Sequence, residues 1–520
     1  MRNEHLHHES VPAGRRARGL GWATSALMLT LLTACGGNND QVKTPPTVTA
    51  TTPASAAAGV ATTTTISVTF DHAMNESTLT PANMTVACPA GTPVTGAVNY
   101  DAATHSAVFT PAAALIGDST CSATVGTGVR DSNGLALASS VAWTFDTATD
   151  PVVAAQGRQI FRYDTFGDET KWTDELHMND VITAAVDPTT ALSVGLKVDA
   201  EALPAAVVQG IENGSISLTS PATTIALLKL DAVVGLKGTV ETINGVDTLT
   251  RVGITCALCH STVDDSFAPG IGKRLDGWPN RDLNPGAIIA LSPALDAATK
   301  AVYNSWGKGK YDPRFNFDGF NGPQVIPPAY GLKGIHSITS TGDGSDIAYW
   351  NRYVGVTQMG GHGTFSEPRT GVLVTNGTDD LISAKLAPLQ AYQISLAAPP
   401  APAGSFDPAA AARGEALFNG AAQCSTCHSG TLLTDANSTL HAPSEVVSEP
   451  EPNGAPSYAS RSATKQYRTA PLAGLWQHAP YFHNGTAATL ADVVATYNTK
   501  KALGLSSADM GDLVQYLKSL

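Results

Sequence analysis

Two short stretches of the sequence carry the same three reactive residues at the same spacing. They are Cys256-Ala-Leu-Cys259-His260 and Cys424-Ser-Thr-Cys427-His428. In a Cys-x-x-Cys-His segment, the two thiols can form thioethers to the vinyl groups of a porphyrin and the adjacent imidazole can bind its iron. Each copy therefore predicts one covalently attached haem c, and the chain is expected to carry two.

Cysteine pairs at this spacing also occur as half of a zinc site or as a redox-active dithiol. Here a His follows both pairs, and no further Cys pair in the sequence is free to complete a four-ligand zinc site. Haem attachment is therefore the favoured interpretation. It assigns the four cysteines to the thioethers, and His260 and His428 to the two irons.

The size and charge of the chain limit what it can be. A chain of 520 residues is too long for one ordinary core, which predicts two to four domains. With Lys+Arg 31 against Asp+Glu 44 the net charge is -13, which argues against nucleic acid as a partner. A redox partner protein or a small-molecule oxidant remains open.

The N-terminus has the organisation of an export signal. Arg15, Arg16 and Arg18 precede an apolar run over residues 20–32, which is too short to span a bilayer as a mature helix. The run ends in Leu32-Thr33-Ala34-Cys35, which resembles the bacterial lipobox, whose Cys is lipidated and becomes the mature N-terminus. Ordinary cleavage with an unmodified Cys35 is the alternative.

This resemblance predicts a lipoprotein signal peptide over residues 1–35 and a polar linker over residues 36–46. The expected location is the bacterial cell envelope, with membrane contact only through the lipid on Cys35. Because Gly36 rather than Asp follows Cys35, the lipoprotein analogy favours the outer membrane, on either its periplasmic or its outer face.

Residues 47–148 show a strand pattern. Short β-branched runs with a period of two are separated by turn residues, as in Thr65-Ile-Ser-Val-Thr-Phe70 and Ser106-Ala-Val-Phe109. The segment resembles the bacterial Ig-like domain, which implies an all-β sandwich. Cys88 and Cys121 are the two cysteines left over, and in an oxidising compartment they are expected to form a disulfide.

The rest of the chain is expected to form two mainly α-helical cytochrome c-type haem domains, over residues 149–398 and 399–520. Helices are expected near residues 156–161, 223–235, 408–418 and 506–520. A hairpin turning at Asn244-Gly245 should deliver the chain to Cys256. The segments Pro327-Pro-Ala-Tyr-Gly-Leu332 and Pro471-Leu-Ala-Gly-Leu475 echo each other, which predicts that the two haem domains form a degenerate repeat.

A family resemblance enters through the C-terminal region. Arg468-Thr-Ala-Pro-Leu-Ala-Gly-Leu475, followed by Ala479-Pro-Tyr-Phe-His-Asn-Gly485 and Thr489-Leu490, resembles the bacterial di-haem cytochrome c peroxidase and MauG superfamily. This chain has Asn484 where the family usually has Asp. The resemblance implies a peroxidase-like haem oxidoreductase, makes His483 a candidate catalytic residue, and implies a bound Ca²⁺.

The same resemblance points to the distal iron ligands. Fourteen residues after His483 the family places Met or, in MauG-type proteins, Tyr, and here that residue is Tyr497. The alternative for Tyr497 is a half-buried helix residue. The first motif lacks the nearby second His of the peroxidases, so its iron is expected either to be five-coordinate or to bind a distant residue, with Met359 and His362 as candidates.

Three functions compete on this sequence. The favoured one is an exported di-haem c-type cytochrome that transfers electrons to a haem-bound oxidant as a peroxidase-like enzyme. The second is a pure electron carrier without substrate turnover. The third is a surface-binding protein that uses its Ig-like domain.

Overall fold

A computed structural model of the chain describes residues 44–89, 91–344 and 346–520. The predicted signal peptide, Cys35 and most of the predicted linker lie outside these residues. Within the part of the chain that is described, no helix is both long and apolar enough to cross a membrane.

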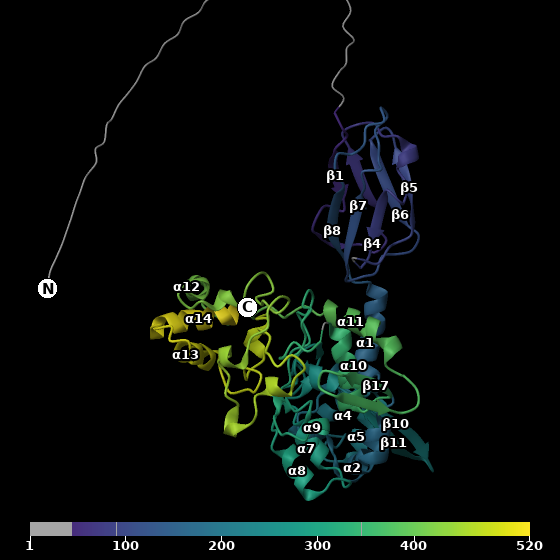
Figure 1. Ribbon diagram of the computed structural model, residues 1–520. Coiled ribbons are helices and arrows are strands. Elements are labelled where there is room, and N and C mark those ends of the chain that lie inside the picture. Colours follow the sequence, from purple (N-terminus) through teal and green to yellow (C-terminus); the bar gives the residue numbers. More distant parts are fainter. Residues whose placement is uncertain (1–43, 90, 345) are drawn as a thin grey trace, which may run out of the picture. The chain divides into compact units, whose positions relative to one another are not determined.

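Residues 48–147 form a sandwich of two four-stranded sheets (Figure 1). Alternation places Ile66, Val68 and Phe70 of one strand in the core, where they meet Phe109 and Phe145. One sheet has the order β1 (Val48–Thr52), β3 (Ile66–Phe70), β6 (Ser106–Pro111) and β5 (Gly96–Asp101), and the other β2 (Ala57–Val60), β8 (Val141–Thr147), β7 (Thr120–Val125) and β4 (Met84–Ala87). The expected Ig-like architecture is present.

A disulfide joins Cys88 to Cys121. Cys88 directly follows β4 and Cys121 belongs to β7, the neighbouring strand of the same sheet. Both cysteines are buried in the core of the sandwich. The bond therefore links two adjacent strands inside this domain.

Residues 149–398 are less helical than the sequence predicts. Short helices alternate with two-stranded sheets and long loops, because much of the chain wraps around a cavity. The helices are α1 (Pro151–Tyr163), α2 (Met178–Ala185), α3 (Pro188–Ser193), α4 (Ala205–Glu212), α5 (Pro221–Lys229), α6 (Ala257–His260), α7 (Pro285–Ala290), α8 (Ala297–Asn304), α9 (Phe315–Asp318), α10 (Ile347–Tyr353) and α11 (Leu386–Ser395), with π-helical turns η2 (Thr170–Glu175) and η4 (Val354–Met359) and short 3-10 turns η3 (Ala200–Ala202) and η5 (Ser383–Lys385).

The strands of this region pair locally. The predicted hairpin is present, and Asn244 and Gly245 both take positive φ, at 52° and 81°, as its two-residue turn requires. The strands are β10 (Leu236–Ile243) with β11 (Val246–Ile254), β12 (Ser261–Val263) with β14 (Arg274–Asp276), β13 (Ile271–Gly272) with β9 (Val198–Asp199), β15 (Lys310–Tyr311) with β16 (Gln324–Val325), and β17 (Gly363–Glu367) with β18 (Val372–Asn376).

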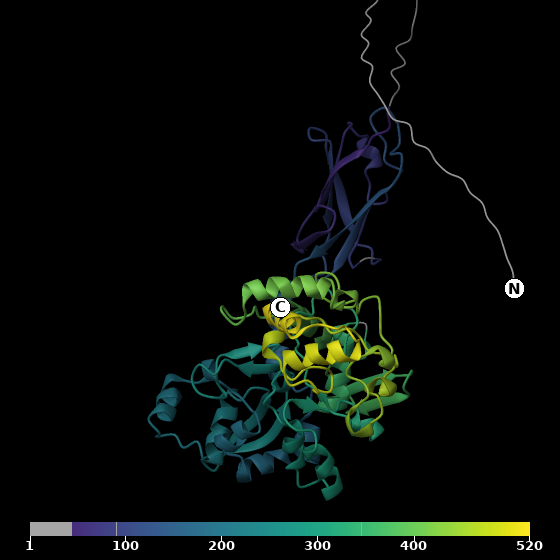
Figure 2. The same cartoon turned by 90° about the vertical axis from the view of Figure 1, so that its left-hand side faces the viewer.

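The C-terminal region has three long helices, α12 (Pro408–Asn419), α13 (Leu490–Lys500) and α14 (Ser507–Ser519), which pack together (Figures 1 and 2). Asp407 caps α12, and capping boxes begin α13 and α14. Ser506 is the cap of α14. Short 3-10 turns lie between α12 and α13: η6 (Cys424–Thr426), η7 (Pro443–Glu445), η8 (Pro452–Gly454), η9 (Tyr458–Arg461) and η10 (Leu475–Gln477).

Each motif follows a helix that a later helix crosses at a glycine. A Cβ on Gly157 of α1 would lie 1.8 Å from the backbone oxygen of Pro388 in α11, and one on Gly414 of α12 would lie 2.1 Å from that of Asp512 in α14. Only glycine permits such close crossings. In both regions, therefore, a helix that precedes the Cys-x-x-Cys-His segment is crossed at a glycine by a later helix.

A buried ionic network joins residues 312–343 to residues 458–464. Arg461 pairs with Asp312 at 3.0 Å and Asp318 at 2.7 Å, while Arg314 pairs with Asp343 and bonds the hydroxyl of Tyr458. The Tyr458 ring also contacts both guanidinium groups, at 4.7 and 5.4 Å from its centroid. These contacts fix the region of the first motif against that of the second.

Candidate haem sites

The first motif lies where the β10–β11 hairpin ends and α6 begins. Cys256, Cys259 and His260 all line one large cavity. The Nδ1 atom of His260 lies 3.0 Å from the carbonyl oxygen of Pro327. Because this partner occupies Nδ1, the remaining ring nitrogen, Nε2, is free to bind a metal ion.

The second motif follows α12 at η6. Cys424, Cys427 and His428 line the same cavity as the first motif. The Nδ1 atom of His428 lies 3.2 Å from the carbonyl oxygen of Leu433, and its ring lies 6.3 Å from the buried ring of Phe418. The two imidazoles are thus oriented in the same way, each by a backbone carbonyl.

The cavity that contains both motifs has a volume of about 830 Å³. Its walls are mostly apolar, with Leu258, Ile288 and Ile289 near the first motif and Leu490 and Val494 near the second. A large apolar cavity with a few placed polar groups is the usual form of a cofactor site.

Buried polar atoms without partners show what kind of group the cavity suits. The Nε atoms of Arg281 and Arg468 have no hydrogen-bond partner among the described residues, nor do amide nitrogens of Gln324 and Gln358. All four side chains line the cavity. Haem is a flat apolar ring with two carboxylates, and buried guanidinium groups bind carboxylates well. The residues present therefore fit haem.

Burial controls the ionisation of the motif residues. It raises the pKa of the Cys256 and Cys259 thiols to about 12 and that of Cys424 to about 11. It lowers the pKa of His260 to about 4, against the opposing effect of the Pro327 carbonyl, and it also lowers the pKa of His428. Both imidazoles are therefore neutral at neutral pH, which is the form that binds metals.

Tyr497 also lines the cavity, from α13. Burial raises its pKa to about 12, and the nearby Cys424 and Cys427 thiols act in the same direction. The ring of Phe482 lies 6.2 Å from that of Tyr497. The structure thus brings Tyr497 to the second motif, where the sequence places a distal ligand.

The two residues proposed for the first iron differ in position. Met359 ends η4, is 3% exposed and lines the cavity, and its carbonyl accepts a hydrogen bond from Trp172 at 3.0 Å. His362 does not line it. Its Nδ1 lies 2.8 Å from Asp379 and its Nε2 lies 3.4 Å from Thr170. Of these two residues, therefore, only Met359 lines the cavity and remains a candidate ligand for the first iron.

His483 lines the cavity and belongs to a buried polar cluster. Its Nε2 lies 2.6 Å from Glu451, and Asn484, which replaces the usual Asp of the family, donates to the same carboxylate at 2.9 Å.

Sequence reasoning missed Glu451, Arg281 and Arg468. Of these, Arg468 had a signal, because it stands in a segment already singled out, Arg468-Thr-Ala-Pro.

Comparison with protein families gives two matches. Residues 42–147 match the bacterial Ig-like domain, and residues 466–502 match a family described as RoxA-like, cytochrome c-like. The second match contains both His483 and Tyr497.

Comparison with curated proteins finds cytochrome c peroxidases. The chain is 30% identical over 151 residues to cytochrome-c peroxidase IdrP1 of Denitromonas iodatirespirans, covering 22% of this chain and 40% of the relative. It is 31% identical over 145 residues to IdrP2 of Pseudomonas sp. (strain SCT), covering 21% and 39%. The chain thus spans about 40% of the length of these relatives.

Part of the chain is thus similar in sequence to bacterial cytochrome c peroxidases. Among solved structures, a MauG-like protein associated with microbial copper homeostasis has 19% identity and a TM-score of 0.27, covering 38% of this chain and 73% of that one. The family matches thus identify a bacterial Ig-like domain followed by a cytochrome c-like region.

Proposed function

We propose that this chain is an exported di-haem c-type cytochrome that transfers electrons to a haem-bound oxidant, as a peroxidase-like oxidoreductase. The observation that carries the proposal is that both Cys-x-x-Cys-His segments line one cavity of about 830 Å³. Two redox groups held in one cavity are close enough to exchange electrons, which a relay serving a reactive site requires.

In this proposal the four motif cysteines carry the thioethers. His260 and His428 would bind the two irons, and Tyr497 is the candidate distal ligand of the second iron. The first iron would stay five-coordinate to receive the oxidant, and Met359 is the candidate ligand if it does not. Bound haem would supply the redox chemistry. One of the two haems would relay electrons, and the other would be the site where the oxidant is reduced.

The chain itself orients ligands, balances charge and excludes water. The carbonyls of Pro327 and Leu433 hold the imidazoles with Nε2 free. Arg281 and Arg468 offer positive charge to the haem carboxylates, and burial that lowers the pKa of each to about 10 leaves both protonated at neutral pH. The apolar walls keep bulk water away, which strengthens each of these electrostatic contacts.

The location and partners belong to the same proposal. Lipid on Cys35 would hold the protein in the cell envelope, with the outer membrane favoured. The electron partner would be a redox protein, and a Ca²⁺ ion is included through the family resemblance.

One observation favours a second candidate, a pure electron carrier. Met359 and Tyr497 both line the cavity, so each iron has a side chain within the same cavity that could fill its sixth position. If both irons had six ligands, neither would have a free coordination position to bind an oxidant.

Spectra of the full chain, matured in a periplasm, separate the two functions. Visible and EPR spectra of the enzyme should show a five-coordinate high-spin iron whose signal changes rapidly when hydrogen peroxide is added. Two low-spin irons that do not respond to peroxide would contradict the enzyme and leave the carrier.

A further inference from the structure

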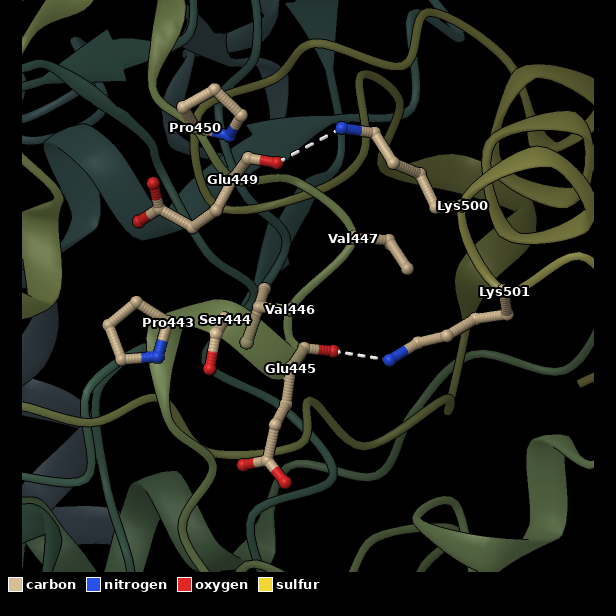
Figure 3. Close-up of a pocket in the computed structure, with 9 residues that line it drawn as sticks. All are labelled: Pro443, Ser444, Glu445, Val446, Val447, Glu449, Pro450, Lys500 and Lys501. Atoms are coloured by element: carbon tan, nitrogen blue, oxygen red, sulfur yellow. Dashed lines mark hydrogen bonds between the residues drawn. The ribbon is translucent and has the colours of Figure 1, made fainter.

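A second pocket lies beside the haem cavity. It has a volume of about 370 Å³ and lies between residues 443–450 and the end of α13. Figure 3 shows Lys500 and Lys501 bonded to the backbone carbonyls of Glu449 and Glu445, at 3.3 and 2.6 Å. The carboxylate of Glu449 points away from Lys500, so the lysine does not neutralise it directly (Figure 3).

The Glu449 carboxylate begins a chain of hydrogen bonds that leads inward. It accepts the hydroxyl of Tyr467 at 2.5 Å. That hydroxyl lies 3.4 Å from Nε2 of His483 and 3.4 Å from Oε1 of Glu451, which are themselves 2.6 Å apart. Tyr467 and His483 line the haem cavity, whereas Glu449 lines the outer pocket.

The inner members of this chain are shielded from solvent. The side chains of His483 and Glu451 are only 7% and 9% exposed. Burial alone would raise the pKa of Glu451, but hydrogen bonds from His483 and Asn484 outweigh it and lower that pKa. Burial and the bond to Glu449 raise the pKa of Tyr467, so its hydroxyl keeps its proton.

Other polar groups surround the chain without interrupting it. Ser448 lies 3.2 Å from Nδ1 of His483, and Ser457 donates to Glu449 at 2.6 Å. Lys310 donates to the carbonyl of Asn484 at 2.9 Å and favours the negative charge of Glu451. Lys500 and Lys501 are further cations that line the outer pocket.

We propose that Glu449, Tyr467 and the His483–Glu451 pair form a proton path from the outer pocket to the haem cavity. A proton from water binds the Glu449 carboxylate. Glu449 then gives a proton to the Tyr467 oxygen while Tyr467 gives its own to the His483–Glu451 pair. The net result is one proton moved inward, with Tyr467 unchanged once its hydroxyl has rotated back.

The path deepens the proposed function, and it rests on haem being bound in this cavity. Reduction of a peroxide to two waters breaks the O–O bond and consumes two electrons and two protons. The electrons come from the redox partner, and the mostly apolar walls of the cavity offer few groups that could carry protons inward. A fixed relay of side chains overcomes this obstacle.

The test follows proton uptake directly. The full haem-loaded chain is photoreduced by a ruthenium dye, iron reduction is followed at the Soret band, and proton uptake is followed with a pH-indicator dye. We expect Tyr467→Phe and Glu449→Gln each to slow proton uptake about tenfold or more. Glu445→Gln is the matched control, since Glu445 lies on the same loop and lines both pockets, but its carboxylate instead accepts the Ala442 amide at 2.7 Å.

Several results would overturn the path. The first is a wild-type protein that takes up no proton when its iron is reduced. The second is a Glu449→Gln variant that takes up protons at the wild-type rate. The third is that Glu445→Gln slows proton uptake as much as Glu449→Gln does. Glu449 lies at the surface pocket, so its variant should fold even where Tyr467→Phe does not. Photoreduction needs no peroxide, so a failure of the peroxidase function would appear separately, as a wild-type protein inert to peroxide.

Discussion

His260 and Pro327 lie 67 residues apart in the sequence, yet the Nδ1 of one is 3.0 Å from the carbonyl oxygen of the other. In the second region the carbonyl that lies 3.2 Å from the Nδ1 of His428 belongs to Leu433, only five residues further along the chain. A backbone carbonyl therefore orients each imidazole, but one comes from a distant segment and the other from beside its own motif.

The first prediction concerns haem attachment. Mass spectrometry of the denatured chain should show two added haem masses, because both motifs are complete and both line the cavity. A Cys256→Ala/Cys259→Ala variant should lose one mass and keep the other. Zinc in place of haem, or no added mass in protein matured in a periplasm, would contradict the attachment.

The second prediction concerns the ionic network between the two regions. Arg461 is 5% exposed and Asp312 is fully buried, so Arg461→Ala leaves a buried carboxylate uncompensated and should cost roughly 3–5 kcal/mol of unfolding free energy. Arg413 is the control, because it is 62% exposed in its pair with Asp512 and Arg413→Ala should lower the free energy of unfolding far less. Denaturant unfolding followed by fluorescence measures both. Equal effects would show that Arg461 is not part of a buried network.

The third prediction concerns acid stability. The folded-state pKa of Glu451 is lowered, so its stabilising effect is fully present above the unfolded value of about 4.3 and is lost as pH falls through the folded value. Glu451→Gln should therefore be less stable than the wild type at pH 7, with the difference shrinking in acid. Melting temperatures of both proteins across the acid range measure this. A difference independent of pH would mean that packing, not charge, makes Glu451 stabilising.

The sequence predicted local features well and long-range ones poorly. The Asn244-Gly245 turn depends only on neighbouring residues, and it is present. The apolar run over 223–235 predicted one helix, but α5 ends at Lys229, because the chain turns at Asp231 with a φ of 54° to enter the hairpin. Arg281, Arg468 and Glu451 gain their importance only from burial beside the cavity, which no local pattern encodes.

Tyr497 provides the sharpest test of the second haem site. It lines the cavity beside Cys424 and Cys427, and it stands where the MauG-type proteins place a tyrosine ligand. A phenolate is a hard anionic donor that stabilises ferric over ferrous iron, so Tyr497→Met should raise the reduction potential of this haem.

Tyr497→Phe keeps the ring's packing and removes only the oxygen, so it should change the visible and EPR spectra of one haem and leave the other unaltered. Tyr516→Phe is the matched control, because Tyr516 packs edge-on against Phe418 at 5.2 Å in the same helical group but is not among the residues that line the cavity. Spectroelectrochemical titration of the three variants gives both readouts. If Tyr497→Phe matches Tyr516→Phe and the wild type in spectra and potentials, Tyr497 is a core residue. His441 and His478, which also line the cavity, then become the next ligands to test.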